Sequence, residues 1–359
     1  ERERIGMKVV GVTGSVGKST TKEMIACVLS SGYRVFKTPA NHNNDIGMPM
    51  AVLGMEEDTQ VAVLEMGMNH FREIAYLTDI AKPDVSVIVN IGTMHIENLG
   101  TREGILQAKM EIAEGMKPGS CLILNGDDAL LQTVKNADLA VKFFGFENAD
   151  VFVKGSALAE DKAALTFDFT CNQGTYTVNL PLEGKHFALD AMAAVAVGLE
   201  FGLAPEAICQ ALSGFQTMAG RQEIYEKDGY TVIQDCYNAG PESMAAALAV
   251  LGNRQGRKIA VLGDMLELGM SAAAEHYKIG RLAAEKTDFV FAYGPNSDRV
   301  VSGALTGGMP DDRAMAFTDR NELVRELKCL AKPGDVLLFK GSHGMHMEMA
   351  LELFFTKEL

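Results

Sequence analysis

Short apolar runs alternate with amphipathic stretches from Met7 onward. In the first part of the chain we expect four buried strands, at residues 8–12, 61–65, 85–91 and 121–124. Buried strands separated by helical patterns are typical of a parallel sheet with helices on its faces. The hydrophobic pattern therefore predicts an α/β domain here.

The pattern changes between residues 151 and 182. Polar and apolar residues alternate there, as in Leu165-Thr-Phe-Asp-Phe-Thr170, and turn residues separate the runs. A period of two is typical of strands with one buried face, so we expect a small antiparallel insert. Two helices, at about 188–201 and 205–212, are expected to close the domain.

A second alternation follows Gly220-Arg221. It predicts strands, each followed by a helix, near residues 230–235, 258–262, 289–293 and 336–339. A length of 359 residues also exceeds what a single core usually holds. We therefore expect a larger α/β domain at residues 1–220 and a smaller, Rossmann-like α/β domain at residues 221–359.

The segment Val9-Val-Gly-Val-Thr-Gly-Ser-Val-Gly-Lys-Ser-Thr-Thr21 runs from an apolar strand through a glycine-containing turn into a helix. This is the context of a P-loop, although the usual pattern has glycine where this chain has Val12. Backbone amides can approach phosphate oxygens there, Lys18 offers a cation, and Ser19 offers a hydroxyl to magnesium. We predict an ATP and Mg²⁺ site at Gly14, Ser15, Val16, Gly17, Lys18, Ser19 and Thr20. The alternative is a tight turn capped by Ser19.

Three further polar residues are candidates for metal binding or chemistry. Glu65 ends the strand at 61–65, and His95 follows the strand at 85–91. An open α/β sheet presents its ligands at the carboxyl ends of strands, and both side chains can bind a divalent metal. Each has an ordinary explanation too: a strand-end cap for Glu65, and a surface or core histidine for His95. By its pattern alone, Lys109 is a solvated helix lysine.

Composition excludes several classes of function. The 33 Lys and Arg against 47 Asp and Glu give a net charge of −14, which disfavours nonspecific binding to nucleic acid or to anionic membranes. The six cysteines are scattered without a CxxC pair, so they indicate neither a zinc site nor a disulfide framework. No apolar run is long enough for a membrane span, and the start at residues 1–4 lacks the apolar core of a signal peptide. We expect a cytoplasmic monomer that binds neither nucleic acid nor membrane.

Blocks along the first part of the chain resemble the Mur ligase family of peptidoglycan synthesis. These blocks are Thr13-Gly-Ser-Val-Gly-Lys-Ser-Thr20, Asn41-His-Asn-Asn-Asp-Ile-Gly-Met-Pro49, Leu64-Glu-Met-Gly67, Asn90-Ile-Gly-Thr-Met-His95 and the later Lys109. The second part is similar to family members that add D-alanyl-D-alanine, in the blocks Asp235-Cys-Tyr-Asn-Ala-Gly-Pro-Glu-Ser-Met244, Val261-Leu-Gly-Asp-Met-Leu-Glu-Leu-Gly269 and Lys340-Gly-Ser-His-Gly-Met-His-Met-Glu348. The resemblance covers nearly the whole chain. It departs from the family where Phe187 and Asp190 replace usual asparagines.

The resemblance implies an ATP-dependent amide ligase. A substrate carboxylate would attack the γ-phosphate, and an amine would then attack the acyl phosphate. The substrates would be a UDP-N-acetylmuramoyl tripeptide and D-alanyl-D-alanine, and the product would serve the cell wall, and with it cell shape and division. The family's usual N-terminal UDP-binding domain has no counterpart in this sequence.

The resemblance also implies roles for individual residues. Lys18 and the nearby amides would hold the β and γ phosphates, Ser19 with Glu65 would serve one magnesium ion, and His95 would serve a second. A lysine at the place of Lys109 is carbamylated in many members, which would make it an anionic ligand of that second metal. Lys18, Lys109 and His95 would thus be catalytic. Further nucleotide contacts would come from Asn43, Asn44, Arg221, Asp235, Asn238 and Lys340.

Two other interpretations stay open. Another amide ligase of the superfamily, which adds a single amino acid or adds glutamates to folate, would share the P-loop. The segments at residues 263–269 and 340–343 favour the D-alanyl-D-alanine member over it. A noncatalytic nucleotide-binding module is the second alternative, and a measurement of ATP hydrolysis or ligation distinguishes it from an enzyme.

Overall fold

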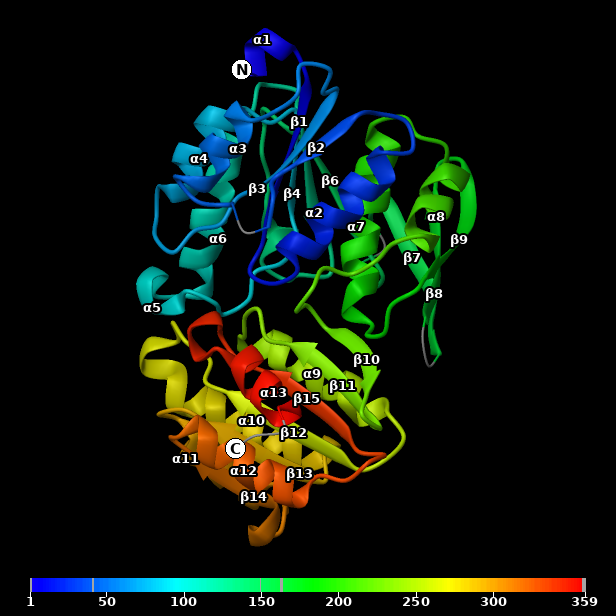
Figure 1. The fold of residues 1–359 in the computed structure, drawn as a ribbon. Coiled ribbons are helices and arrows are strands. Elements are labelled where there is room, and N and C mark those ends of the chain that lie inside the picture. The colour runs from blue at the N-terminus through cyan, green and yellow to red at the C-terminus, as the bar shows by residue number, and fades with distance from the viewer. Residues whose placement is uncertain (1, 41, 149, 162–163, 357–359) are drawn as a thin grey trace. The chain divides into compact units, whose positions relative to one another are not determined.

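The computed structural model describes residues 2–40, 42–148, 150–161 and 164–356. The chain divides into two compact units, Glu1–Gln216 and Thr217–Leu359. The boundary predicted after residue 220 lies close to this division. Each unit is built around its own sheet (Figure 1).

The described residues of the first unit form a nine-stranded sheet in the order β2-β3-β1-β4-β5-β6-β7-β8-β9. The strands are β1 Lys8–Thr13, β2 Val35–Lys37, β3 Val61–Glu65, β4 Val85–Ile88, β5 Cys121–Asn125, β6 Ala140–Gly145, β7 Val153–Asp161, β8 Ala164–Cys171 and β9 Gly174–Leu180. Pairing is parallel from β2 across to β7 and antiparallel from β7 to β9. The prediction of a mostly parallel sheet with a small antiparallel part is confirmed, and the antiparallel strands extend the same sheet.

Helices cover both faces of this sheet (Figure 1). One face carries α2 Lys18–Leu29, α7 His186–Glu200 and α8 Pro205–Ser213, and the other carries α3 Gly47–Leu53, α4 Glu73–Ala81 and α6 Arg102–Met110. The short helices α1 Arg2–Ile5 and α5 Ile96–Leu99 complete the set described. Side chains of a strand alternate between faces, so Val10 and Val12 pack against α2 while Val9 packs on the opposite side.

The carboxyl ends of β3, β1 and β4 lie side by side in the sheet. Strand β1 lies between β3 and β4, with Val12 opposite Glu65 and Thr13 opposite Ile88. The predicted P-loop follows β1 directly. Parallel strands end at the same edge of a sheet, so the residues after β3 and β4 flank the loop on its two sides.

The described residues of the second unit form a six-stranded sheet in the order β10-β11-β15-β12-β13-β14. The strands are β10 Glu223–Lys227, β11 Tyr230–Asp235, β12 Lys258–Gly263, β13 Phe289–Tyr293, β14 Ala314–Phe317 and β15 Val336–Lys340. The pair β10 and β11 is antiparallel and the other pairs are parallel. The prediction of a smaller α/β domain is confirmed.

The helices of the second unit locate its ligand-binding edge. Helices α9 Pro241–Asn253, α10 Ala272–Lys286 and α11 Ser297–Thr306 cover one face, and α12 Arg320–Leu330 and α13 Met347–Phe355 cover the other. Strand β15 leads into α13, whereas its neighbours β11 and β12 lead to the opposite face. In open α/β sheets such a switch in direction is where ligands commonly bind, at the carboxyl ends of strands; Lys340 ends β15 at this edge.

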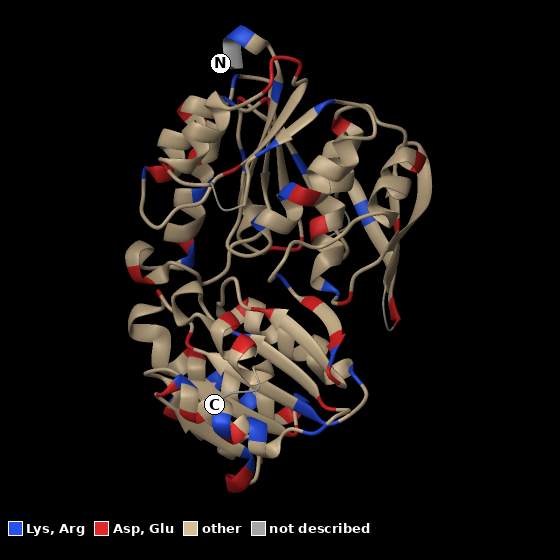
Figure 2. Cartoon of the chain, in the orientation of Figure 1, with Lys and Arg blue, Asp and Glu red and all other residues tan. Residues whose placement is uncertain are grey.

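Charged residues of both signs are interspersed along the helices and loops of each unit (Figure 2). Among the described residues, no helix is long and apolar enough to cross a membrane. The six cysteines are free thiols, as their scattered positions predicted.

Candidate nucleotide site

A left-handed glycine joins the P-loop to α2. Gly17 has φ of 84° and forms the N-cap of α2, so the N-cap residue offers no side chain to the first N–H groups of the helix. Ser19 lies inside α2 and is not its N-cap residue. The first N–H groups of a helix lack partners inside the helix, so this end can bind an anion. A Cβ atom at position 17 would lie 2.5 Å from Asp190 Oδ1; glycine is thus required by both the backbone and its neighbour.

Asn90, directly after β4, braces the P-loop from one side. Its Oδ1 accepts from the backbone N–H groups of Ser15 at 3.1 Å and Val16 at 2.9 Å, and its Nδ2 donates to the Val16 carbonyl at 2.8 Å. Gly92 N–H donates to Ser15 Oγ at 2.9 Å. Lys18 Nζ donates to the Ser15 carbonyl at 3.2 Å. The loop conformation is thus fixed by hydrogen bonds to the neighbouring strand end.

Glu65, at the end of β3, flanks the loop on the other side. It is 1% exposed, and its Oε1 accepts from Asn43 Nδ2 at 2.9 Å. Its backbone N–H donates to Thr38 Oγ1 at 3.0 Å. The second oxygen, Oε2, is buried and has no hydrogen-bond partner within the described residues; Lys22 Nζ lies 3.8 Å away. A buried carboxylate oxygen without a donor is suited to a cation.

Lys109 is a buried residue of α6. It is 1% exposed, so the interpretation as a solvated helix lysine is wrong. No hydrogen bond or ion pair of its ammonium is seen within the described part of the chain. Burial, and then the charge of Lys18, lower the pKa of Lys109 well below its ordinary value. The structure therefore brings Lys18 and Lys109 together, in surroundings that disfavour the charged form of Lys109.

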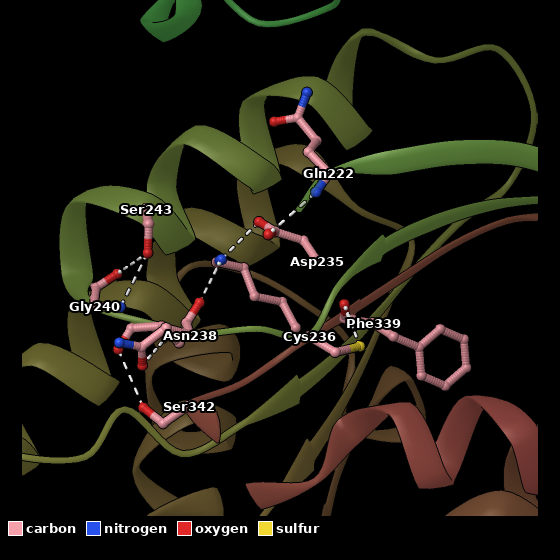
Figure 3. A network of polar contacts seen from close by, with 10 residues as sticks. Gln222, Asp235, Cys236, Asn238, Gly240, Ser243, Phe339 and Ser342 are labelled. Carbon is pink, nitrogen blue, oxygen red and sulfur yellow. Dashed lines mark hydrogen bonds and ion pairs between the residues drawn. The ribbon is translucent and has the colours of Figure 1, made fainter. Parts of the chain in front are cut away.

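A polar network gathers at the carboxyl ends of β11 and β15 in the second unit (Figure 3). Lys340, 1% exposed, places its Nζ 2.6 Å from Asp235 Oδ2 and donates to the Asn238 carbonyl at 2.9 Å. Ser342 Oγ donates to the Ala239 carbonyl at 3.1 Å. The predicted residues Asp235, Asn238 and Lys340 thus meet at one place.

Arg221 belongs to the same neighbourhood. Its guanidinium lies 3.9 Å from the centroid of the Tyr237 ring, and that ring lies 5.9 Å from the ring of His343. Backbone N–H of the next residue, Gln222, donates to Asp235 Oδ1 at 3.3 Å. The residues around the start of the second unit and those after β15 are therefore linked through Asp235 and Tyr237.

Comparison with known proteins identifies the family. A family model of the Mur ligase middle domain matches residues 12–198, and a model of the Mur ligase glutamate ligase domain matches residues 220–343. The chain belongs to the Mur ligase family. As a Mur ligase it is an ATP-dependent ligase, which confirms the predicted enzyme class and the ATP requirement.

Relatives of this Mur ligase align over almost all of its length. It is 42% identical over 350 residues to UDP-N-acetylmuramoyl-tripeptide--D-alanyl-D-alanine ligase of Bacillus subtilis (strain 168), covering 96% of this chain and 75% of that protein. MurF from Acinetobacter baumannii matches with a TM-score of 0.90 and 33% identity, covering 98% and 77%. MurF ligase from Thermotoga maritima, in complex with ADP, matches with a TM-score of 0.87 and 31% identity, covering 98% and 81%.

Other predicted site residues of this Mur ligase have different surroundings. His95 lies beyond the carboxyl end of β4, where it starts α5 with a left-handed φ of 65°. Asn44 Oδ1 accepts from the backbone N–H of Gly47 at 2.7 Å and so stabilises the start of α3, whereas Asn43 reaches Glu65. Asn41 lies outside the described residues.

The two residues that replace usual asparagines are both buried. Phe187 packs in the core between the sheet and α7. Asp190 is 4% exposed, and Thr21 Oγ1 donates to its Oδ1 at 2.9 Å. Asp190 therefore lies against the start of α2, next to Gly17, and the family difference at this position borders the P-loop.

The described residues beside the P-loop supply only some of the ligands that a metal ion needs. Among the described residues, no three His, Cys, Asp or Glu side chains come together as a metal site. Magnesium commonly takes one or two carboxylates, with phosphate oxygens and water as its other ligands. Glu65 and the Ser19 hydroxyl fit that arrangement. Lys109 as an ammonium beside Lys18 does not fit a cation; as a carbamate it would.

The bracing roles of three residues were missed by sequence reasoning. Asn90 lies near the end of the strand predicted at 85–91 and begins one of the blocks that resemble the family, so that block was the available signal. Asp264 is 2% exposed at the end of β12, and its Oδ2 accepts from Asn296 Nδ2 at 2.8 Å. His276 Nε2 accepts from Met265 N–H at 2.9 Å. Both Asp264 and His276 thus hold the segment after β12, through contacts that are remote in sequence.

Proposed function

We propose that this Mur ligase joins the terminal carboxylate of a UDP-N-acetylmuramoyl tripeptide to the amino group of D-alanyl-D-alanine, with conversion of ATP to ADP and phosphate. The observation that carries the proposal is the similarity to D-alanyl-D-alanine ligases along both units. It includes residues 263–269 and 340–343, which the network of the second unit connects through Ser342. A UDP-linked substrate is a cytoplasmic metabolite, so we place the reaction in the cytoplasm. The monomeric state stays a prediction.

The reaction would proceed in two displacements. The substrate carboxylate attacks the γ-phosphorus and releases ADP, and the amine then attacks the acyl carbon and releases phosphate. Both steps concentrate negative charge at the start of α2. Lys18 and the uncapped amides of that helix would stabilise the charge, while the Asn90 brace holds the loop in position.

Ser19 and Glu65 would hold one magnesium ion. When bound, this ion would supply positive charge to the phosphate oxygens. The buried Oε2 of Glu65, which lacks a hydrogen bond, supports this assignment. His95 and a carbamate on Lys109 would serve a second ion.

Lys109 would be carbamylated by carbon dioxide. The neutral amine attacks the carbon, an N–C bond forms as one C=O π bond opens, and the nitrogen loses a proton to water, so that a neutral amine becomes an anionic carbamate. The lowered pKa of Lys109 supplies the reactive amine. The new anion would neutralise the charge of Lys18 next to it.

In the second unit, Asp235, Asn238 and Arg221 would contact the nucleotide. Lys340 is already paired with Asp235. Its contribution would be to hold that carboxylate in place as well as to add charge.

The test is phosphate release by the purified chain with ATP, magnesium, the UDP-linked tripeptide and D-alanyl-D-alanine. We expect release that requires both acceptor substrates and that Lys18→Ala abolishes. Release with D-alanine or L-glutamate in place of the dipeptide would favour another ligase of the family. Tight ADP binding without any release would favour a noncatalytic module.

A further inference from the structure

Lys22, which the proposed mechanism does not use, is completely buried in the first unit. It lies on α2, one turn after Lys18, and its side chain is 0% exposed. Lysine is seldom buried unless its ammonium is paired, because removing the charge from water is unfavourable. The partners of Lys22 therefore indicate why a charge is kept there.

The ammonium of Lys22 has four close oxygen neighbours. It donates to the carbonyls of Thr38 at 2.8 Å and Ala40 at 3.3 Å, and Glu23 Oε1 lies at 3.2 Å. Glu65 Oε2 is the most distant, at 3.8 Å. The ammonium thus donates two hydrogen bonds to backbone carbonyls, and Glu23 pairs with its charge. Glu65 Oε2 consequently receives positive charge from Lys22 but no hydrogen bond.

The same contacts orient Glu65 from two directions. Thr38 accepts from Lys22 with its carbonyl and from the Glu65 backbone N–H with its hydroxyl. Asn43, a few residues further on, donates to Glu65 Oε1. Lys22 therefore connects α2, the helix that follows the P-loop, to the segment around Thr38 and Asn43 that orients Glu65.

We propose that Lys22 is a positioning residue for magnesium-assisted nucleotide binding. Its ammonium holds Glu65 in place and balances its charge, while it leaves Oε2 without a hydrogen bond and available to the metal. Lys22 itself does not touch the nucleotide. The inference rests on the proposed magnesium site at Glu65.

The test separates the magnesium-dependent part of nucleotide affinity from the rest. The Kd for ADP is measured by calorimetry on the purified chain with magnesium and with EDTA, and the ratio of the two gives the magnesium enhancement. Lys22→Met should leave the Kd in EDTA within about twofold, because Lys18 and the helix amides are intact. It should reduce the enhancement about tenfold, a common size for coupling between sites. Equal weakening in both conditions, or an unchanged enhancement, would overturn the inference.

A matched control is available on the neighbouring strand. Lys37, on β2, is half-exposed and pairs with the same Glu23. Lys37→Met should leave the enhancement unchanged, because Lys37 has no contact with Glu65 among the described residues. A loss equal to that of Lys22→Met would assign the effect to Glu23 and contradict our inference.

A double mutant tests whether Lys22 acts through Glu65. Glu65→Gln should lower the magnesium enhancement, and adding Lys22→Met should lower it no further, because residues that act through one interaction are not additive. A further loss in the double mutant would place Lys22 outside this interaction. If the wild type shows no enhancement, or Glu65→Gln retains it, the magnesium site itself is wrong.

Folding of the variants is checked by circular dichroism and thermal unfolding. If Lys22→Met does not fold, Lys22→Gln keeps a donor for Thr38 without the charge and should show the same selective loss. Lys22→Arg keeps the charge and should retain most of the enhancement. If neither uncharged variant folds, Lys22 is required for the fold itself and the positioning role is rejected.

Discussion

Each unit buries a lysine beside its predicted site, and the two lysines have opposite surroundings. Lys340, in the second unit, pairs with Asp235 at 2.6 Å and is 1% exposed. Lys109, in the first unit, is equally buried but lies near Lys18, and its pKa is lowered well below the ordinary value. Burial disfavours a charged amine unless an opposite charge compensates for it. The comparison teaches that burial alone does not decide the state of a lysine: Lys340 has a carboxylate beside it, whereas Lys109 has another cation nearby.

The largest expected effect is on stability, from Lys340→Met. It leaves Asp235 without its counter-ion, and breaking a buried pair on one side commonly destabilises by about 3–5 kcal/mol. Lys109→Met should not destabilise the first unit, because it leaves no partner uncompensated and removes an amine whose burial is unfavourable. Urea unfolding, with the transitions of the two units followed separately, measures both. Equal destabilisation by the two variants would remove the distinction.

The next effect is on catalysis, from Lys109→Ala. Loss of a ligand to the proposed second metal should lower phosphate release by about 10- to 100-fold, as loss of metal-site support often does. A short carboxylate such as acetate should partly restore release by occupying the vacant position, whereas Lys109→Arg should not recover. Normal release by both variants would mean that Lys109 has no role in ligation.

A smaller effect concerns the pH dependence of stability. The folded pKa of Lys109 is depressed, so above that pKa the folded state binds fewer protons than the unfolded state. The free energy of unfolding should then rise with pH until the pH reaches the ordinary lysine pKa of about 10.4. The rise should be at most about 1.4 kcal/mol per pH unit. Urea unfolding at two pH values in carbon dioxide-free buffer should show a shallower rise for Lys109→Met than for the wild type. Identical slopes would indicate a charged, compensated Lys109.

The smallest effect separates the two causes of that shift. Burial contributes more than the charge of Lys18. Lys18→Ala should therefore raise the folded pKa of Lys109 only slightly and keep most of the rise in stability with pH that Lys109→Met weakens, measured by the same unfolding series. If Lys18→Ala removed the whole slope, the neighbouring charge would be the main cause.

The sequence predicted elements best where burial determines the pattern. The strands at 61–65 and 289–293 agree with the structure at both ends, because continuous apolar runs mark strands covered on both faces. The strand at 230–235 also agrees at both ends, although only its central residues are buried. Strands β2 and β6 were not predicted. Both have exposed or partly exposed residues, so their apolar signal is weak.

The site was predicted in its outline and not in its contacts. Lys18 and Glu65 follow from local motifs at strand ends. The burial of Lys109 was missed, although it stands four residues after Ile105 on the buried face of α6. The contacts of Lys22 with Thr38, and of Asp190 with Thr21, join segments that are separated in sequence. Such contacts depend on the tertiary fold and have no local pattern.

The approach of Asp190 to Gly17 has a consequence for how the sequence can vary over evolution. Any larger residue at position 17 needs a left-handed backbone and also space that the Asp190 carboxylate occupies. A lineage could enlarge position 17 after position 190 had become smaller, whereas the reverse order would pass through a misfolded loop. The two positions, far apart in the gene, are thus expected to change in a fixed historical order.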